Sequence, residues 1–317
     1  MSRILVTGDQ GFVGAETVRL LVARGHQVVG YDIMHGNDIR DIKQLEAAIA
    51  EWNPDRILHL AAIARFSDAD AQPWLAYQTN VIGTSNVAAV ATKFHKPVVY
   101  ASTGSVYMPI KQKPPITEDF WTGGNSNYGV TKHLGELAIK RGTAPYIILR
   151  YAHLYGREKR MHGLIGGYLD RIKRGLAPTL YGGKQSNDFT YIKDVARANV
   201  CALEAPWDKW NQVYNVGTGE ELSAEKAGDL VIKTWNVYNP KEKFKGKVDK
   251  REVRTVDPER FVYDTTKAEV MLGFKAEFDF EKGLHDMFAP GIVVSPIQDV
   301  DTILGEDEGE GGVTSHA

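Results

Sequence analysis

The sequence feature that most constrains the fold is a glycine-rich turn directly after a short apolar run near the N-terminus. Ile4-Leu5-Val6 has strand character, and the next residues read Thr7-Gly8-Asp9-Gln10-Gly11-Phe12-Val13-Gly14. Gly8 permits a tight turn, Gly11 lets a pyrophosphate approach the backbone, and Gly14 lets a following helix pack closely on the strand. The free N–H groups and partial positive charge at the start of that helix attract phosphate. The pattern predicts a dinucleotide-binding strand–turn–helix.

A carboxylate at the end of the next predicted strand indicates which dinucleotide is bound. Residues 28–31 read Val-Val-Gly-Tyr, and Asp32 follows them. A carboxylate at this position accepts hydrogen bonds from both ribose hydroxyls and repels a 2′-phosphate, which favours NAD over NADP. Asp38-Ile39 follows six residues later and is expected to hold the adenine by side chain and backbone.

Short apolar runs alternate with helical patterns through the first half of the chain. Strands that are apolar throughout and alternate with helices indicate a parallel sheet covered on both faces, and right-handed crossovers make that sheet doubly wound. The predicted fold class is α/β, a doubly wound parallel (Rossmann) sheet with a smaller C-terminal α/β substrate lobe. Predicted strands cover 4–7, 28–31, 56–61, 97–102 and 145–150, and predicted helices cover 12–24, 42–52, 74–93 and 128–140.

The second half is less regular and divides between the two predicted regions. Residues 1–155 and about 188–216 are assigned to the NAD-binding Rossmann domain, and about 156–187 and 217–288 to the substrate lobe. The acidic tail, 289–317, contains the run GEDEGEGG. Such a run is too polar and too rich in glycine to pack, so we expect the tail to be disordered.

A tyrosine and a lysine mark the expected catalytic helix. Tyr128 and Lys132 lie four residues apart and therefore share one helix face. A lysine ammonium near a phenol lowers the pKa of the phenol, and the positive nicotinamide ring is expected to add to this effect. The phenol can then exchange a proton with a sugar hydroxyl near neutral pH. Thr103, at the end of the preceding predicted strand, can hydrogen-bond the same hydroxyl.

Composition excludes several other classes of protein. Net charge is −2, from 38 basic and 40 acidic residues, so no basic excess indicates binding to nucleic acid or to an anionic membrane. The sequence has no apolar run long enough to span a bilayer and no signal-peptide pattern at its start. Cys201 is the single cysteine, which excludes internal disulfides and cysteine-based zinc sites, and no histidine spacing indicates a metal. We expect a cytoplasmic protein without a metal.

Together these motifs resemble the extended short-chain dehydrogenase/reductase family of sugar-nucleotide epimerases and dehydratases. The resemblance covers about residues 1–288. Besides the glycine turn and the Tyr128/Lys132 pair, it includes His59-Leu60-Ala61-Ala62, Asn80-Val81-Ile82-Gly83-Thr84, Ser102-Thr103-Gly104-Ser105-Val106-Tyr107, and the segments 150–156, 188–195 and 215–219.

The resemblance implies a role for each matched residue. Tyr128 would be the general base and acid, Lys132 its partner and a ribose ligand, and Thr103 the aligned hydroxyl. Residues implied to contact NAD are Gly8, Gln10, Gly11, Phe12, Val13, Gly14, Asp32, Asp38, Ile39, Leu60, Ala61, Ala62, Asn80, Lys132 and Tyr151. Residues implied to contact the substrate, with a UDP-sugar favoured, are Thr103, Tyr128, His153, Asn187 and Arg254.

Two residues after Thr103 distinguish between reactions of this family. Family dehydratases and decarboxylases carry acidic residues there, whereas this chain has Gly104 and Ser105, neither of which can act as a carboxylate acid or base. The resemblance therefore favours 4-epimerisation, by hydride removal from C4, rotation of the 4-keto sugar and hydride return to its other face.

Three departures from the family's epimerases keep alternatives open. His153 replaces a sugar-contacting Asn, Asn187 replaces a diphosphate-binding Arg, and the stretch from Asp32 to Asp38 is short. The short stretch is similar to that of NAD(P)H-dependent 4-keto-sugar reductases and dehydrogenases, which form the second hypothesis. A non-catalytic NAD-binding protein is the third. Family members often form homodimers through helices beside the equivalents of Asn80 and Tyr128, and a homodimer is expected here.

Overall fold

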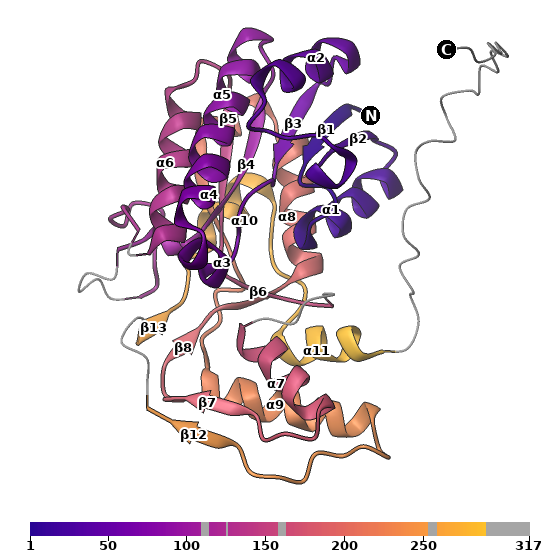
Figure 1. Cartoon of the computed structure of the whole chain (residues 1–317), viewed down its shortest axis with the longest axis vertical. Coiled ribbons are helices and arrows are strands. Elements are labelled where there is room, and N and C mark those ends of the chain that lie inside the picture. The colour runs from indigo at the N-terminus through magenta and orange to yellow at the C-terminus, as the bar shows by residue number, and fades with distance from the viewer. Residues whose placement is uncertain (109–113, 125, 158–162, 253–258, 290–317) are drawn as a thin grey trace, which may run out of the picture.

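A parallel six-stranded sheet forms the centre of the molecule. The computed structural model describes residues 1–108, 114–124, 126–157, 163–252 and 259–289. The strand order is β10-β5-β4-β3-β1-β2, and every pair of neighbours is parallel (Figure 1). The predicted doubly wound α/β class is therefore confirmed. The six strands are β1 (Arg3–Thr7), β2 (Gln27–Tyr31), β3 (Arg56–His59), β4 (Val98–Thr103), β5 (Tyr146–Tyr151) and β10 (Gln212–Val216).

Alternate strand residues contribute to two separate hydrophobic cores. In β1, Ile4 and Val6 belong to one core and Leu5 to the other. Because both faces are buried, the strands read as continuous apolar runs instead of alternating patterns. The first core is covered by α1 (Phe12–Ala23) and α8 (Ile192–Glu204), and the second by α2 (Ile42–Trp52), α5 (Thr84–Lys93) and α6 (Asn127–Arg141).

The helix predicted over residues 74–93 is interrupted in the structure. It divides into α4 (Pro73–Tyr77), a π-helical turn (Gln78–Gly83) and α5, and a short helix α3 (Phe66–Ala71) precedes it. The predicted helical stretch is therefore confirmed, and the π-helical turn inside it was not predicted. Within the π turn, the side chain of Asn80 bonds to the backbone of Ile63, and Gly83 packs on Ile39. Inserted residues of this kind occur most often near functional sites.

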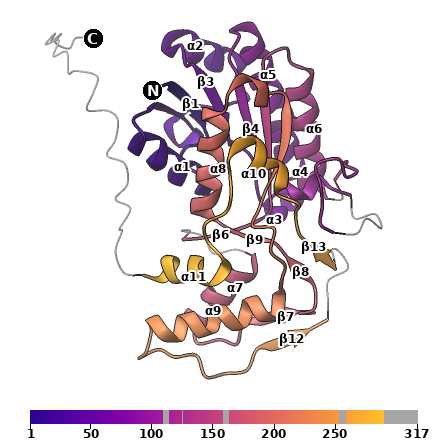
Figure 2. The same ribbon diagram turned by 180° about the vertical axis from the view of Figure 1, so that it is seen from behind.

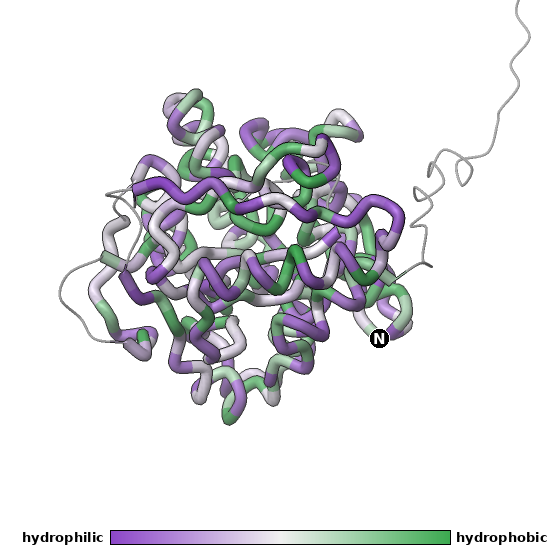
Figure 3. Tube along the Cα trace, turned by 90° about the horizontal axis from the view of Figure 1, so that it is seen from below, coloured by the Kyte–Doolittle hydropathy of each residue, from purple (hydrophilic) through white to green (hydrophobic). Residues whose placement is uncertain are grey.

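A smaller region lies below the carboxyl ends of the strands (Figures 1 and 2). Its helices α7 and α9 pack on each other, and α11 packs on α9. Seen from below, helical coils alternate between hydrophilic and hydrophobic residues, as amphipathic helices do (Figure 3). The elements of this region are β6 (His153–Tyr155), α7 (Gly163–Lys173), β7 (Thr179–Tyr181), β8 (Ser186–Asn187), β9 (Phe189–Tyr191), β11 (Leu222–Ser223), α9 (Ala224–Tyr238), β12 (Asp249–Arg251), β13 (Arg260–Phe261) and α11 (Phe280–Phe288).

The predicted division into two domains stays a prediction. One helix, α10 (Thr266–Leu272), falls within the range assigned to the smaller lobe but packs on β10 of the large sheet. Except for Ala289, the predicted tail lies outside the described residues. Within the described part of the chain, no helix is long and apolar enough to cross a membrane.

The glycine turn generates a stability prediction. A Cβ on Gly14 would lie 2.1 Å from the carbonyl oxygen of Gly8, so helix α1 can approach the turn this closely only without a side chain. We expect Gly14→Ala to lower the free energy of unfolding by about 1–3 kcal/mol in chemical denaturation. Gly167→Ala is the matched control, because it lies in α7 and a Cβ there would have no neighbouring atom within 4 Å. That control should be neutral or stabilising by up to about 1 kcal/mol, and equal effects of the two would contradict the close-packing argument.

Candidate active site

The start of α6 places the predicted tyrosine and lysine in the interior. Gly124 turns the chain with a positive φ of 76°, and Ser126 caps the helix by accepting a hydrogen bond from the N–H of Gly129 at 3.1 Å. Tyr128 therefore lies in the first turn and Lys132 in the second. Their side chains are 9% and 3% exposed. The positive end of the helix dipole lies at the same end of the helix as Tyr128 and favours a phenolate there.

Thr103 ends β4 beside this helix. Its hydroxyl lies close enough to the hydroxyl of Tyr128 to lower the pKa of that phenol, and its Oγ1 accepts the N–H of Ser105 at 3.2 Å. The last residue of a parallel strand and the first turn of the next helix meet at the carboxyl edge of the sheet, where doubly wound folds bind their ligands. The structure thus brings Thr103 and Tyr128 together.

Burial dominates the ionisation of both predicted catalytic groups. It raises the pKa of Tyr128 to about 12, and the hydrogen bond from Thr103 acts in the opposite direction. It lowers the pKa of Lys132 to about 7, although the carboxylate of Glu136 acts to raise it. The ammonium of Lys132 lies 4.1 Å from the ring centroid of Tyr100. Desolvation dominates the pKa of Tyr128 in this structure, and the lowering expected from Lys132 and the nicotinamide ring stays a prediction.

Behind the pair lies a buried ionic network that the sequence analysis missed. Glu136 is fully buried and accepts a bidentate pair of hydrogen bonds from Arg150 at 2.8 and 2.7 Å. It also accepts the hydroxyl of Ser102 at 2.6 Å. The signal was present in the spacing, because residues 128, 132 and 136 follow one face of a helix at intervals of four.

The sequence analysis also missed two aromatic side chains, Phe261 and Tyr263, that pack on Gly104 beside Thr103. A Cβ on Gly104 would lie 2.3 Å from the ring of Phe261 and 2.5 Å from the hydroxyl of Tyr263. These two aromatic residues lie far along the chain, and no local pattern links them to Gly104. The structure therefore has no room for an acidic side chain at position 104 unless Phe261 moves.

The residues expected to contact substrate differ in their exposure. His153 is exposed on β6, and its ring lies 6.0 Å from that of Phe189 and 5.5 Å from that of Phe261. Asn187, on β8, has a buried Oδ1 to which no described residue donates. Arg254 lies outside the described residues.

The glycine turn has the close backbone approach that a dinucleotide requires. A Cβ on Gly8, which has φ +74°, would lie 2.6 Å from the backbone nitrogen of Ala61. Gly11 caps α1 and is exposed. The backbone of α1 is thus open to a phosphate at the helix start, an arrangement that fits the pyrophosphate of NAD. Phe12, Val13, Leu60, Ala61 and Ala62 are all partly exposed around this turn.

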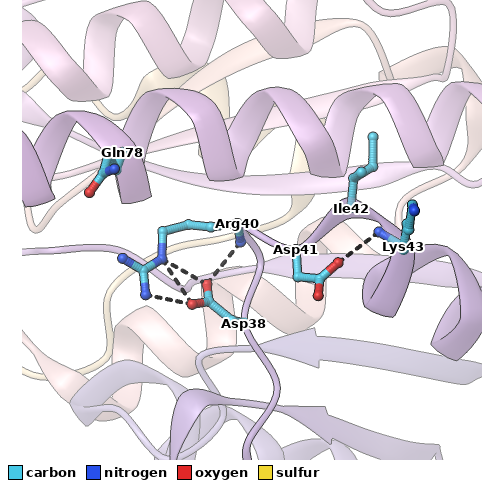
Figure 4. Close-up of a pocket in the computed structure, with 6 residues that line it drawn as sticks. All are labelled: Asp38, Arg40, Asp41, Ile42, Lys43 and Gln78. Carbon is cyan, nitrogen blue, oxygen red and sulfur yellow. Dashed lines mark hydrogen bonds and ion pairs between the residues drawn. The ribbon is translucent and has the colours of Figure 1, made fainter.

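The adenosine end of the predicted cofactor site contains three acidic side chains. Asp32 ends β2 and accepts the N–H groups of Gln10 at 3.3 Å and Met34 at 2.9 Å. Asp38 is held by Arg40, whose Nε lies 2.9 and 3.0 Å from its two oxygens, and this guanidinium lowers the pKa of the carboxyl. A pocket of about 520 Å³ opens beside this pair (Figure 4). It is lined by Asp38, Arg40, Asp41, Ile42, Lys43 and Gln78.

Three predicted cofactor contacts have their side chains committed to the protein. Asn80 is fully buried, and its amide bonds to the backbone of Ile63 and to the hydroxyl of Thr131. The side chain of Ile39 packs on Gly83, which leaves its backbone for an adenine contact. The hydroxyl of Tyr151 donates to Asn199 at 2.6 Å. The hydrogen bonds of Asn80 therefore indicate that it positions the segment at Ile63 and does not contact the cofactor directly.

The buried amine generates a pH-dependent prediction. The pKa of the Lys132 amine is about 7 in the folded chain, against an ordinary value of 10.5. Between these two pH values the unfolded chain therefore binds more protons than the folded chain. Stability therefore rises with pH across that window as the cost of burying the charge disappears. We expect nucleotide-free Lys132→Met to be more stable than wild type by about 1–3 kcal/mol near pH 6, with the difference shrinking toward pH 10.

Thermal unfolding at several pH values measures this difference. Lys93→Met is the control, because its amine on α5 is more than half exposed and its loss should change stability by no more than about 0.5 kcal/mol at either pH. A Lys132→Met advantage that does not vary with pH would show that desolvation of the charge is not its cause.

Comparison with known proteins gives the family. The sequence profile of the NAD dependent epimerase/dehydratase family matches residues 4–217. A putative UDP-glucose 4-epimerase of Methanocaldococcus jannaschii is 31% identical over 310 residues, which cover 89% of this chain and 95% of the relative. A UDP-N-acetyl-alpha-D-glucosaminuronate decarboxylase of Bacillus cytotoxicus is 29% identical over 90% of this chain and 96% of its own length.

Solved structures agree with this assignment. The UDP-glucose 4-epimerase of Thermotoga maritima, solved with UDP-glucose, superimposes with a TM-score of 0.81 at 25% identity over 90% of this chain and 97% of its own. The UDP-glucose 4-epimerase of Thermus thermophilus, solved with NAD, gives a TM-score of 0.77 at 26% identity over 92% of this chain and 100% of its own. The present chain belongs to the NAD-dependent epimerase/dehydratase family and is an NAD-dependent enzyme of the extended short-chain dehydrogenase/reductase type.

Proposed function

We propose that the protein is a 4-epimerase of UDP-sugars. The observation that carries the proposal is the pairing of Tyr128 with Thr103 at the sheet edge, beside a position 104 that cannot hold an acid. The first relatives of this chain include enzymes named UDP-glucose 4-epimerase and UDP-glucuronate 4-epimerase. The sugar itself and the steps below belong to the proposal.

In this proposal Tyr128 exchanges a proton with the 4-hydroxyl of the sugar, and Thr103 hydrogen-bonds the same oxygen. When bound at the glycine turn, NAD would supply the hydride acceptor and donor for the sugar carbon. The burial that raises the pKa of Tyr128 must be offset for proton transfer near neutral pH. The start of α6 and the positive charge of the oxidised cofactor both act in that direction. Lys132 adds to this effect when it is protonated.

The aromatic packing beside Thr103 supports epimerisation over the family's eliminations. Dehydration requires an acid or base that acts on the sugar next to the carbonyl. Phe261 and Tyr263 occupy the space into which such a side chain would extend from position 104. Ser105, the next residue, is engaged by its hydrogen bonds with Thr103. The same packing argues against the decarboxylase activity for which one relative is named.

One experiment tests the reaction and its principal residue. Purified protein is incubated with UDP-glucose, UDP-galactose and UDP-uronic acids without added cofactor, and the products are identified by NMR. We expect one of them to be epimerised, and Tyr128→Phe to lower turnover about 10²- to 10⁴-fold because no proton can be exchanged. Tyr146→Phe, on β5, is the control and should keep its turnover.

The outcomes distinguish the alternatives. Stoichiometric consumption of free NADH or NADPH with a 4-keto-sugar, without epimerisation, would favour the reductase that the short stretch between Asp32 and Asp38 suggests. Unchanged turnover of Tyr128→Phe would contradict the proposed base. Absence of any epimer from all the nucleotide sugars would contradict the proposal itself. The cytoplasmic location stays a prediction.

We also propose that the enzyme is a homodimer formed through α4, α5 and α6, which lie together on one side of the molecule (Figures 1 and 2). Five large apolar side chains on these helices and the π turn between them are exposed in the described structure: Trp74, Tyr77, Ile82, Val130 and Leu137. Val130 and Leu137 lie seven residues apart and so share one face of α6. Exposed apolar side chains gathered on neighbouring helices are typical of an interface.

The proposed dimer interface can be tested by measuring the mass of the protein in solution after a substitution in that interface. We expect wild type to behave as a dimer in sedimentation or light scattering, and Leu137→Asp to shift it toward monomer by placing a charge in the interface. Leu176→Asp introduces the same charge at a similarly exposed leucine beyond α7 and should leave the dimer intact. A monomeric wild-type protein would rule out the interface.

A further inference from the structure

The glycine turn contains a buried carboxylate to which none of the motifs assigns a role. Asp9 follows Gly8 and is 5% exposed. Its Oδ2 accepts the side-chain amide of Gln10 at 2.6 Å and lies 3.5 Å from Nε2 of His35, while no described residue donates a hydrogen bond to Oδ1. Burial of a carboxylate that is only partly hydrogen-bonded is costly. The Asp9 carboxylate lies in the turn that is expected to bind the cofactor, so we asked whether it contributes to cofactor binding.

A glycine in the neighbouring strand makes the space for this carboxylate. Gly30 lies in β2, two residues before Asp32, and a Cβ there would lie 2.3 Å from Oδ2 and 2.4 Å from Cγ of Asp9. The carboxyl group thus packs directly on the backbone of β2. Asp9 and Gly30 are therefore a matched pair, because any side chain at position 30 would displace the carboxylate.

Residue Gln10 joins Asp9 to Asp32. Its backbone N–H donates to Asp32 at 3.3 Å, and its side-chain amide donates to Asp9 at 2.6 Å. Two carboxylates therefore bond to the same residue, at the strand end where the ribose of a dinucleotide is held. A 2′-phosphate placed there meets both negative charges, whereas the 2′-hydroxyl of NAD meets acceptors to which it can donate.

We propose that Asp9 is a second determinant of dinucleotide specificity, which acts with Asp32 to exclude a 2′-phosphate. The exposed imidazole of His35 is the one basic side chain among the described residues that forms an ion pair with Asp9. Asp32 supplies one negative charge at the end of β2, and Asp9 supplies a second one behind it, against Gly30. The proposal depends on binding of NAD and not on which reaction the enzyme performs.

Binding of the reduced cofactors tests the proposal. NADH and NADPH are titrated into nucleotide-free protein, and their fluorescence gives the two dissociation constants. Asp9→Asn keeps the shape of the side chain and removes its charge. We expect it to lower the ratio of the NADPH constant to the NADH constant at least about tenfold, with the NADH constant changed far less. Asp208→Asn removes a charge at an exposed site and should leave the ratio unchanged.

A second variant leaves Asp9 in place, so the test does not depend on the folding of Asp9→Asn. Asp32→Asn should still discriminate against NADPH at least about tenfold, because Asp9 remains. The double variant should discriminate less than either single variant. If Asp32→Asn binds NADPH and NADH equally, Asp32 is the sole determinant and the proposal is wrong. If Asp9→Asn folds and keeps the wild-type ratio, the carboxylate is structural only. Neither result bears on epimerisation, which the product assay measures separately.

Discussion

The buried ion pair between Glu136 and Arg150 holds the catalytic helix against the sheet. Glu136 lies on α6 and Arg150 on β5, and Ser102 of β4 donates to the same carboxylate. Three elements are thus joined behind the point where Thr103 and Tyr128 meet. The pair raises the pKa of Arg150 and lowers that of Glu136, so both stay charged. Loss of one partner from such a pair typically costs about 3–5 kcal/mol, because the other charge is left buried and unpaired.

Small residues decide what the site can contain. Gly104 admits Phe261 and Tyr263, Gly30 admits Asp9, and Gly8 admits the backbone of Ala61. In each case a missing side chain makes room for a group from a distant part of the chain. The first leaves no room for an acid at position 104, the second brings a carboxylate against β2, and the third brings the turn against the backbone of Ala61. Chemistry and specificity therefore depend on packing as much as on the reactive groups.

Burial sets the charge state of the groups in the site. It raises the pKa of Tyr128 and lowers that of Lys132. The interior therefore favours the neutral form of each. A catalytic phenolate then requires positive charge that arrives with the cofactor, in addition to the dipole of α6. This requirement couples proton transfer to NAD binding.

The sequence by itself determined the doubly wound sheet, the position of the glycine turn and the Tyr128/Lys132 face of α6. These depend on local periodicity and on spacings of three or four residues, which any helix or strand makes visible. It did not predict the π-helical turn around Asn80, whose side chain bonds to Ile63 seventeen residues earlier. Nor did it predict Phe261 on Gly104 or Glu136 with Arg150. Those pairings were decided by tertiary structure alone, since they join residues that only the folded sheet brings within contact distance.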